Sequence, residues 1–134
     1  MKLTENEVVE HLCNWLIKEG WQILNKNIDH SRGTDIKAEK GRKLLIVKAK
    51  GARGNPRSHV TTRKKFDCGQ IKTHLGKAIV KVLELKNDYP KALLAIAQPD
   101  DPDIRKCLQK VIPEITKLKI KLFWISTAGQ VIEE

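Results

Sequence analysis

The stretch that decides the fold runs from residue 33 to residue 51 and reads GTDIKAEKGRKLLIVKAKG. Residues 34–39 and residues 43–50 have the short alternating or continuously apolar patterns that are typical of strands. The segment Lys40-Gly41-Arg42 between them predicts a hairpin-like connection. The stretch therefore predicts two neighbouring antiparallel strands.

This pairing decides which charged side chains meet. Successive side chains of a strand point to opposite faces, so Asp35 shares a face with Glu39, and Lys48 and Lys50 share a face with Ile46. Antiparallel pairing can bring Asp35 beside both lysines. Such a cluster is either a structural salt bridge or part of a site that handles phosphate, and the residues alone leave both interpretations open.

The other elements follow from their own periodicity and end signals. A helix is predicted over residues 5–19, because Thr4 and Glu7 form a capping box and Gly20 ends the pattern. The apolar stripe of this helix also carries Glu5, which therefore faces inward. The remaining predictions are a strand over 21–27, a helix over 67–86, a strand over 91–98, a helix that opens at Asp101-Pro102-Asp103 and is bent or ended by Pro113, and a strand over 119–126 that residues 130–132 can extend.

The order of these elements is helix, three strands, helix, strand, helix, strand. It predicts a three-layer α/β domain with a mixed central sheet. A chain of 134 residues has the length of one ordinary domain, so we expect a single domain over residues 1–134.

The positive charge of the chain is large and local. The formal net charge is +10, and residues 37–65 alone carry eleven Lys and Arg against one acid, which indicates a polyanionic partner. Residues 51–66 show no buried pattern and predict a basic loop that faces DNA, with phosphate contacts from Arg53, Arg57, Arg63, Lys64 and Lys65. Because aromatic residues make up only 4% of the chain, stacking platforms for single strands are scarce, and double-stranded or branched DNA is the expected partner.

The cysteines and the N-terminus bear on the compartment. Cys13, Cys68 and Cys107 are odd in number, far apart and without metal-ligand spacing, which predicts reduced thiols and disfavours a zinc site. The N-terminus lacks the pattern of a signal peptide, and no apolar run approaches the roughly 20 residues of a membrane span. We therefore expect a cytoplasmic protein without a membrane partner.

The motif and the element order together resemble the restriction-endonuclease-like, or PD-(D/E)XK, nuclease superfamily, in the manner of the archaeal Holliday-junction resolvases. The resemblance covers the chain from about Glu5 to Trp124 and is carried by four residues at the expected spacing, Gly33, Asp35, Lys50 and Gly51. It implies that Glu5 or a helix neighbour supplies a further acid and that Gln70 lies beside the site, where it would contact DNA. The chain departs from the family at Lys48, where the signature has an acid.

The resemblance implies phosphodiester hydrolysis with Mg²⁺ or Mn²⁺, because a divalent cation offsets charge on the phosphate oxygens and lowers the pKa of the attacking water. Asp35 and the carbonyl of Ala49 would be metal ligands, and Lys50 would orient water or steady the phosphate. An ammonium at Lys48 opposes a cation about 4 Å away by about 4 kcal/mol per unit of charge at an effective dielectric constant near 20. Four alternatives stay open: Glu5 supplies the second carboxylate, Glu39 does so, Lys48 turns away to a phosphate, or Lys48 itself replaces the metal.

Two functions from different classes follow. The first is a metal-dependent DNA endonuclease, impaired by Lys48, with Asp35, Lys48, Lys50 and Glu5 as its catalytic residues and Asp35, Ala49 and Glu5 as its metal ligands. The second is a DNA-binding module on a degenerate nuclease fold. The resemblance also allows a homodimer, because cutting two strands calls for two sites.

Overall fold

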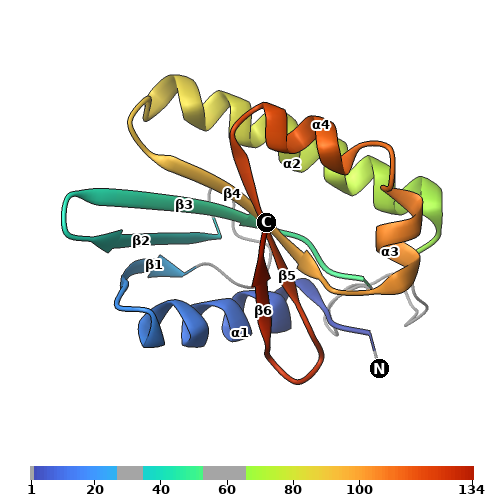
Figure 1. The fold of residues 1–134 in the computed structure, drawn as a ribbon, viewed down its shortest axis with the longest axis horizontal. Helices are drawn as coiled ribbons and strands as arrows, with labels where there is room; N and C mark the ends of the chain where they lie inside the picture. The colour runs from blue at the N-terminus through green and yellow to red at the C-terminus, as the bar shows by residue number, and fades with distance from the viewer. Residues whose placement is uncertain (1, 27–34, 53–65) are drawn as a thin grey trace.

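The computed structural model describes residues 2–26, 35–52 and 66–134, and in it a sheet lies between two helical layers (Figure 1). One layer is α1 (Glu5–Lys18), and the other contains α2 (Cys68–Asp88), α3 (Pro102–Cys107) and α4 (Ile112–Lys117). The strands are β1 (Gln22–Lys26), β2 (Ile36–Lys40), β3 (Lys43–Ala49), β4 (Leu93–Pro99), β5 (Ile120–Ile125) and β6 (Val131–Glu133). The predicted three-layer α/β class is confirmed.

The described strands form a six-stranded mixed sheet in the order β1-β2-β3-β4-β5-β6. The pairs β1/β2, β2/β3 and β5/β6 are antiparallel, whereas β3, β4 and β5 are parallel. The parallel connections contain the helices α2, α3 and α4, as a crossover between parallel strands requires. The predicted hairpin is formed by β2 and β3, in which Ile36 lies opposite Val47.

Two buried apolar clusters show which face each side chain occupies. Val47 and Ala49 pack in the cluster that includes the apolar stripe of α1, whereas Ile46 packs with α2 on the other face. Strand alternation therefore places Lys48 and Lys50 on the face covered by α2. Ile36 belongs to the α1 cluster, so its neighbour Asp35 also faces α2.

The end of β3 meets the start of α1 at Gly51. A Cβ atom on Gly51 would lie 2.4 Å from the backbone nitrogen of Glu5 and 2.7 Å from the carbonyl carbon of Thr4. Only a residue without a side chain allows this approach. The capping box of Thr4 and Glu7, predicted from the sequence, fixes the same helix end, with the Glu7 N–H donating to Thr4 Oγ1 at 3.2 Å and the Thr4 N–H donating to the Glu7 carboxylate at 2.8 Å.

The segment after β4 differs from the prediction. Asp101 caps a helix that begins at Pro102, as expected, but α3 already ends at Cys107. Pro113 lies in the first turn of the separate helix α4 rather than at the end of α3. A proline in a first turn removes no helical hydrogen bond, so here it accompanies a helix start. Residues 131–133 do not extend the last strand, as predicted for residues 130–132, but form a separate edge strand, β6, which turns back and pairs antiparallel with β5.

The prediction of three reduced cysteines is wrong. Cys68 at the start of α2 and Cys107 at the end of α3 form a disulfide with a Cα–Cα distance of 5.6 Å, and Cys13 is free and buried. The two partners are 39 residues apart in sequence, and only the packing of α2 beside α3 brings them together. In residues 2–26, 35–52 and 66–134, none of the helices combines the length and apolarity that crossing a membrane requires.

Candidate functional site

The centre of the candidate site is an ion pair between Asp35 and Lys48. The Asp35 N–H donates to the carbonyl of Val47 at 3.2 Å, which continues the β2/β3 ladder and sets the two side chains on one face. The Lys48 ammonium lies 3.4 Å from Asp35 Oδ2, and the Asp35 residue is only 3% exposed. The predicted meeting of Asp35 and Lys48 across the hairpin is therefore present in the structure.

The same carboxylate oxygen has a second donor. The backbone N–H of Ala49 donates to Asp35 Oδ2 at 2.7 Å. Burial raises the pKa of Asp35, whereas the Ala49 hydrogen bond and the positive charges of Lys48 and Lys50 lower it, and burial has the larger effect. The Asp35 carboxylate is thus bound by the Lys48 ammonium and by the backbone N–H of Ala49.

The Lys50 side chain interacts electrostatically with the other charged residues of the site. The backbone N–H of Lys50 donates to the carbonyl of Ala97 at 2.9 Å, which extends the β3/β4 pairing by one residue. Burial lowers the pKa of the half-buried Lys50 side chain, the Glu5 and Asp35 carboxylates raise it, and the charges of Lys48 and Lys77 lower it. Glu5 therefore acts electrostatically on Lys50 from the start of α1, although the rest of α1 covers the opposite face of the sheet.

His74 on α2 is a site neighbour that the sequence analysis did not select. Its ring packs edge-on against Phe66, with ring centroids 4.5 Å apart. Burial lowers the pKa of His74, and the nearby charges of Lys50 and Lys77 lower it further. The lowered pKa favours the neutral ring, which has one donor and one acceptor. The available signal was its position on α2 beside the apolar stripe, one turn before Ala78.

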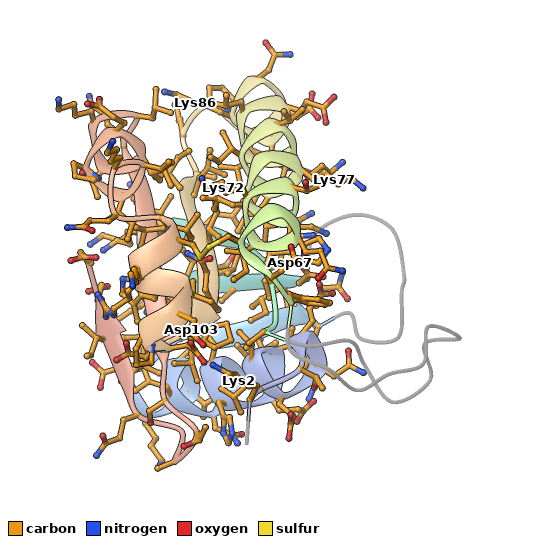
Figure 2. The ribbon with its side chains drawn as sticks, turned by 90° about the vertical axis from the view of Figure 1, so that its right-hand side faces the viewer. Lys2, Asp67, Lys72, Lys77, Lys86 and Asp103 are labelled. Atoms are coloured by element: carbon orange, nitrogen blue, oxygen red, sulfur yellow. A yellow bond between two sulfur atoms is a disulfide. The ribbon has the colours of Figure 1, made fainter. Side chains whose placement is uncertain are left out.

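The lysines of α2 lie on different sides of the helix. Lys77 projects to one side, whereas Lys72 and Lys86 lie on the other (Figure 2). Lys77 and Lys86 are nine residues apart, which is about half a turn around the helix axis. Only Lys77 of these three influences Lys50. Of these three lysines, it is therefore Lys77 that adds to the positive charge around Lys50.

Several predicted DNA contacts lie outside the described residues, namely Arg53, Arg57, Arg63, Lys64 and Lys65, as does Gly33 of the motif. Gln70 is described and exposed. Its side-chain oxygen accepts from the Asp67 N–H at 3.0 Å, and its own N–H donates to Asp67 Oδ1 at 2.8 Å, which makes the two residues the capping box of α2. Gln70 thus has a structural contact in the described protein, and its contact with DNA stays a prediction.

The residues present do not fit a divalent metal as they stand. Asp35 Oδ2 accepts the Ala49 N–H at 2.7 Å and lies 3.4 Å from the Lys48 ammonium, whose positive charge opposes a cation there. Among the described residues, no group of three or more His, Cys, Asp or Glu side chains is arranged to hold a metal ion. A cation at Asp35 would need Lys48 to move away, since like charges at this distance repel strongly.

Comparisons with known proteins identify the fold. No protein-family model matches the chain, and no curated protein matches its sequence. An XisH family protein from Nostoc punctiforme superposes with a TM-score of 0.58 at 23% identity, over 96% of this chain and 95% of that one. A fdxN element excision controlling factor protein from Anabaena variabilis gives a TM-score of 0.58 at 21% identity over the same shares. At such identities the likeness concerns the fold alone, and it agrees with the expected three-layer α/β fold with a mixed sheet.

Proposed function

We propose that the chain is a DNA-binding module on a restriction-endonuclease-like fold, in which Lys48 occupies the place of a catalytic acid and binds Asp35 in place of a metal. The observation that carries the proposal is the Lys48–Asp35 ion pair at 3.4 Å. With the site acid paired to an ammonium, the remaining cations serve to bind phosphate. The site holds an anion and does not prepare water for attack.

Charge and burial support phosphate binding at Lys50. A half-buried ammonium has lost part of its hydration, and its lowered pKa records that cost. A phosphate oxygen close by would offset the cost, because charge-assisted hydrogen bonds are stronger in a partly desolvated site. Lys77 and the donor or acceptor of His74 lie around the same position. Contacts of this kind bind the DNA backbone and carry no base sequence.

A matched pair of variants tests this proposal. Lys77→Gln removes a charge beside Lys50, and Lys86→Gln removes a charge from the other side of the same helix. Binding of a labelled duplex and of a four-way junction is measured by fluorescence anisotropy as a function of salt. Lys77→Gln should weaken binding and flatten the slope of log K against log salt by about 0.9. Lys86→Gln should leave the slope unchanged, and equal slopes for both variants would remove the site from the binding surface.

The second candidate function is a metal-dependent endonuclease of low activity. It is favoured by one observation, that the carboxylates of Glu5 and Asp35 both act on Lys50. Both acids thus act on the same ammonium, and a metal-dependent site would need them to come together around one ion. Plasmid relaxation in Mg²⁺ and in Mn²⁺ tests it, with Asp35→Asn as the control. Cleavage that requires the metal and is lost in the control would establish the enzyme and replace the binding-module proposal.

A further inference from the structure

We propose that the Cys68–Cys107 disulfide is a thiol-exchange site that reacts with a small anionic thiol of the glutathione class. The disulfide lines an open pocket of about 820 Å³ between α2 and α3. Neither Asp35 nor Lys50 lines this pocket, and the proposal does not depend on DNA binding. The proposal rests on the exposure of Cys68 and Cys107, on the charged side chains that line the pocket, and on the positions of the two cysteines in their helices.

Access distinguishes this disulfide from the third cysteine. Cys68 is exposed and Cys107 is half-buried, and both line the pocket, so a dissolved thiol can reach the bond. Cys13 is 3% exposed, and burial raises its pKa to about 11. A buried thiol with a raised pKa forms little thiolate and reacts slowly. Cys13 therefore serves as an unreactive internal control for the accessible Cys68–Cys107 disulfide.

The pocket is suited to an anionic thiol because lysines surround it. Its lining includes three exposed lysines, Lys72, Lys106 and Lys110. It also includes two acids, but each is engaged by the protein: Asp103 Oδ2 lies 3.0 Å from the Lys2 ammonium, and Asp67 Oδ1 accepts from the Gln70 N–H. The carboxylates of a glutathione-like molecule would therefore be attracted, and a thiol with a positive charge would be repelled.

The helix positions of the two cysteines decide which sulfur leaves. Cys68 is the first residue of the 21-residue helix α2, where the helix dipole favours negative charge, and Lys72 follows one turn later. Cys107 is the last residue of α3, where the dipole disfavours it. A thiol with a lower pKa leaves faster in thiol–disulfide exchange. Cys68 is therefore the leaving group.

The exchange is balanced as follows. The incoming thiolate attacks Cys107 Sγ, the bond between the two cysteine sulfurs breaks, and its electron pair leaves on Cys68 Sγ as a thiolate. The product is a mixed disulfide between Cys107 and the small thiol. A second molecule of the same thiol can then attack the mixed disulfide at the sulfur of the small thiol, which releases Cys107 as a thiolate and the small molecule as its own disulfide. No other oxidant or reductant is required.

The test uses the folded full chain and two small thiols of opposite charge, reduced glutathione and cysteamine. Loss of the disulfide and formation of mixed disulfides are followed by mass spectrometry with peptide mapping. The pocket variant Lys72→Gln/Lys106→Gln/Lys110→Gln keeps both cysteines and hence the disulfide. The control variant Lys18→Gln/Lys86→Gln/Lys91→Gln removes the same charge elsewhere on the surface.

We expect glutathione to modify the native protein at Cys107 and to leave Cys13 untouched. The pocket variant should react with glutathione about fivefold more slowly than the control variant, with no such slowing for cysteamine. Equal rates for the two variants would overturn the role of the pocket. A disulfide that resists glutathione until the chain is unfolded in urea would overturn the proposal, and an adduct on Cys68 would overturn the assignment of the leaving group.

Discussion

The Lys48–Asp35 ion pair makes a quantitative prediction for Lys48→Glu. At the observed 3.4 Å, one unit pair is worth about 5 kcal/mol at an effective dielectric constant of about 20. The substitution removes this attraction and sets a second carboxylate beside a buried one. Both terms destabilise the fold in the absence of a metal.

The repulsion has an upper limit, because one carboxyl can take up a proton instead. At pH 7 that costs roughly 4 kcal/mol for an ordinary carboxyl pKa near 4, at 1.36 kcal/mol per pH unit. The pKa of Asp35 is already raised by burial, so the limit lies below this value. We expect Lys48→Glu to be about 2 to 4 kcal/mol less stable than Lys48→Gln at pH 7 in EDTA. The gap should shrink to about 1 kcal/mol at pH 5, where protonation is cheap.

Mg²⁺ should reverse the effect in this variant alone. A cation between the two carboxylates stabilises the folded state by about 2.7 kcal/mol at a concentration one hundred times its dissociation constant. Lys48→Gln is the matched control, since it removes the ammonium without adding a ligand. Metal-dependent plasmid cleavage should appear in Lys48→Glu and disappear on adding Asp35→Ala.

The assay is urea unfolding followed by tryptophan fluorescence, with Trp124 fully buried as a reporter, in EDTA and in Mg²⁺. Equal stability of Lys48→Glu and Lys48→Gln in EDTA, together with no response of either to Mg²⁺, would refute the reasoning. In that case the two side chains do not share a cleft that a cation can enter.

Four further measurements address other parts of the molecule. Gly51→Ala should cost about 1 to 3 kcal/mol in urea unfolding, because the new methyl group would lie 2.4 Å from the Glu5 backbone, and a neutral result would contradict the close approach of β3 to α1. Gln98→Met should stabilise the protein by about 1 kcal/mol, because Gln98 Nε2 is buried without a partner among the described residues; destabilisation by that amount would show a hidden partner. Burial and the charges of Lys50 and Lys77 lower the pKa of His74 in the folded state. The free energy of unfolding should therefore fall as the pH drops below about 6.5, the pKa of His74 in the unfolded chain, toward its lower pKa in the folded protein. His74→Gln should flatten this pH dependence in thermal unfolding between pH 7 and pH 5. Joint neutralisation of the basic loop changes Arg53, Arg57, Arg63, Lys64 and Lys65. It should flatten the slope of log K against log salt for duplex binding by about 0.9 per lost contact, and unchanged affinity would exclude the loop as a contact surface.

The sequence by itself determined the class of the fold and one half of the candidate site. Strand alternation and the short turn at residues 40–42 place Asp35 and Lys48 on one face, and the structure brings them to 3.4 Å. The predicted capping box of Thr4 and Glu7 is similarly local, because a cap and its partner are three residues apart. Signals of this kind depend on neighbours within a few residues, and such neighbours are fixed by the chain itself.

Only the tertiary structure decided which distant elements meet. The place of Glu5 near Lys50 depends on the start of α1 reaching the end of β3, which the absence of a side chain at Gly51 permits. His74 and Lys77 join the site because α2 packs over that face of the sheet. Cys68 and Cys107 pair because α2 and α3 lie together, although their spacing in sequence predicted free thiols. Periodicity shows which side of an element is buried, but the partner of that side is set by packing among elements that are remote in sequence.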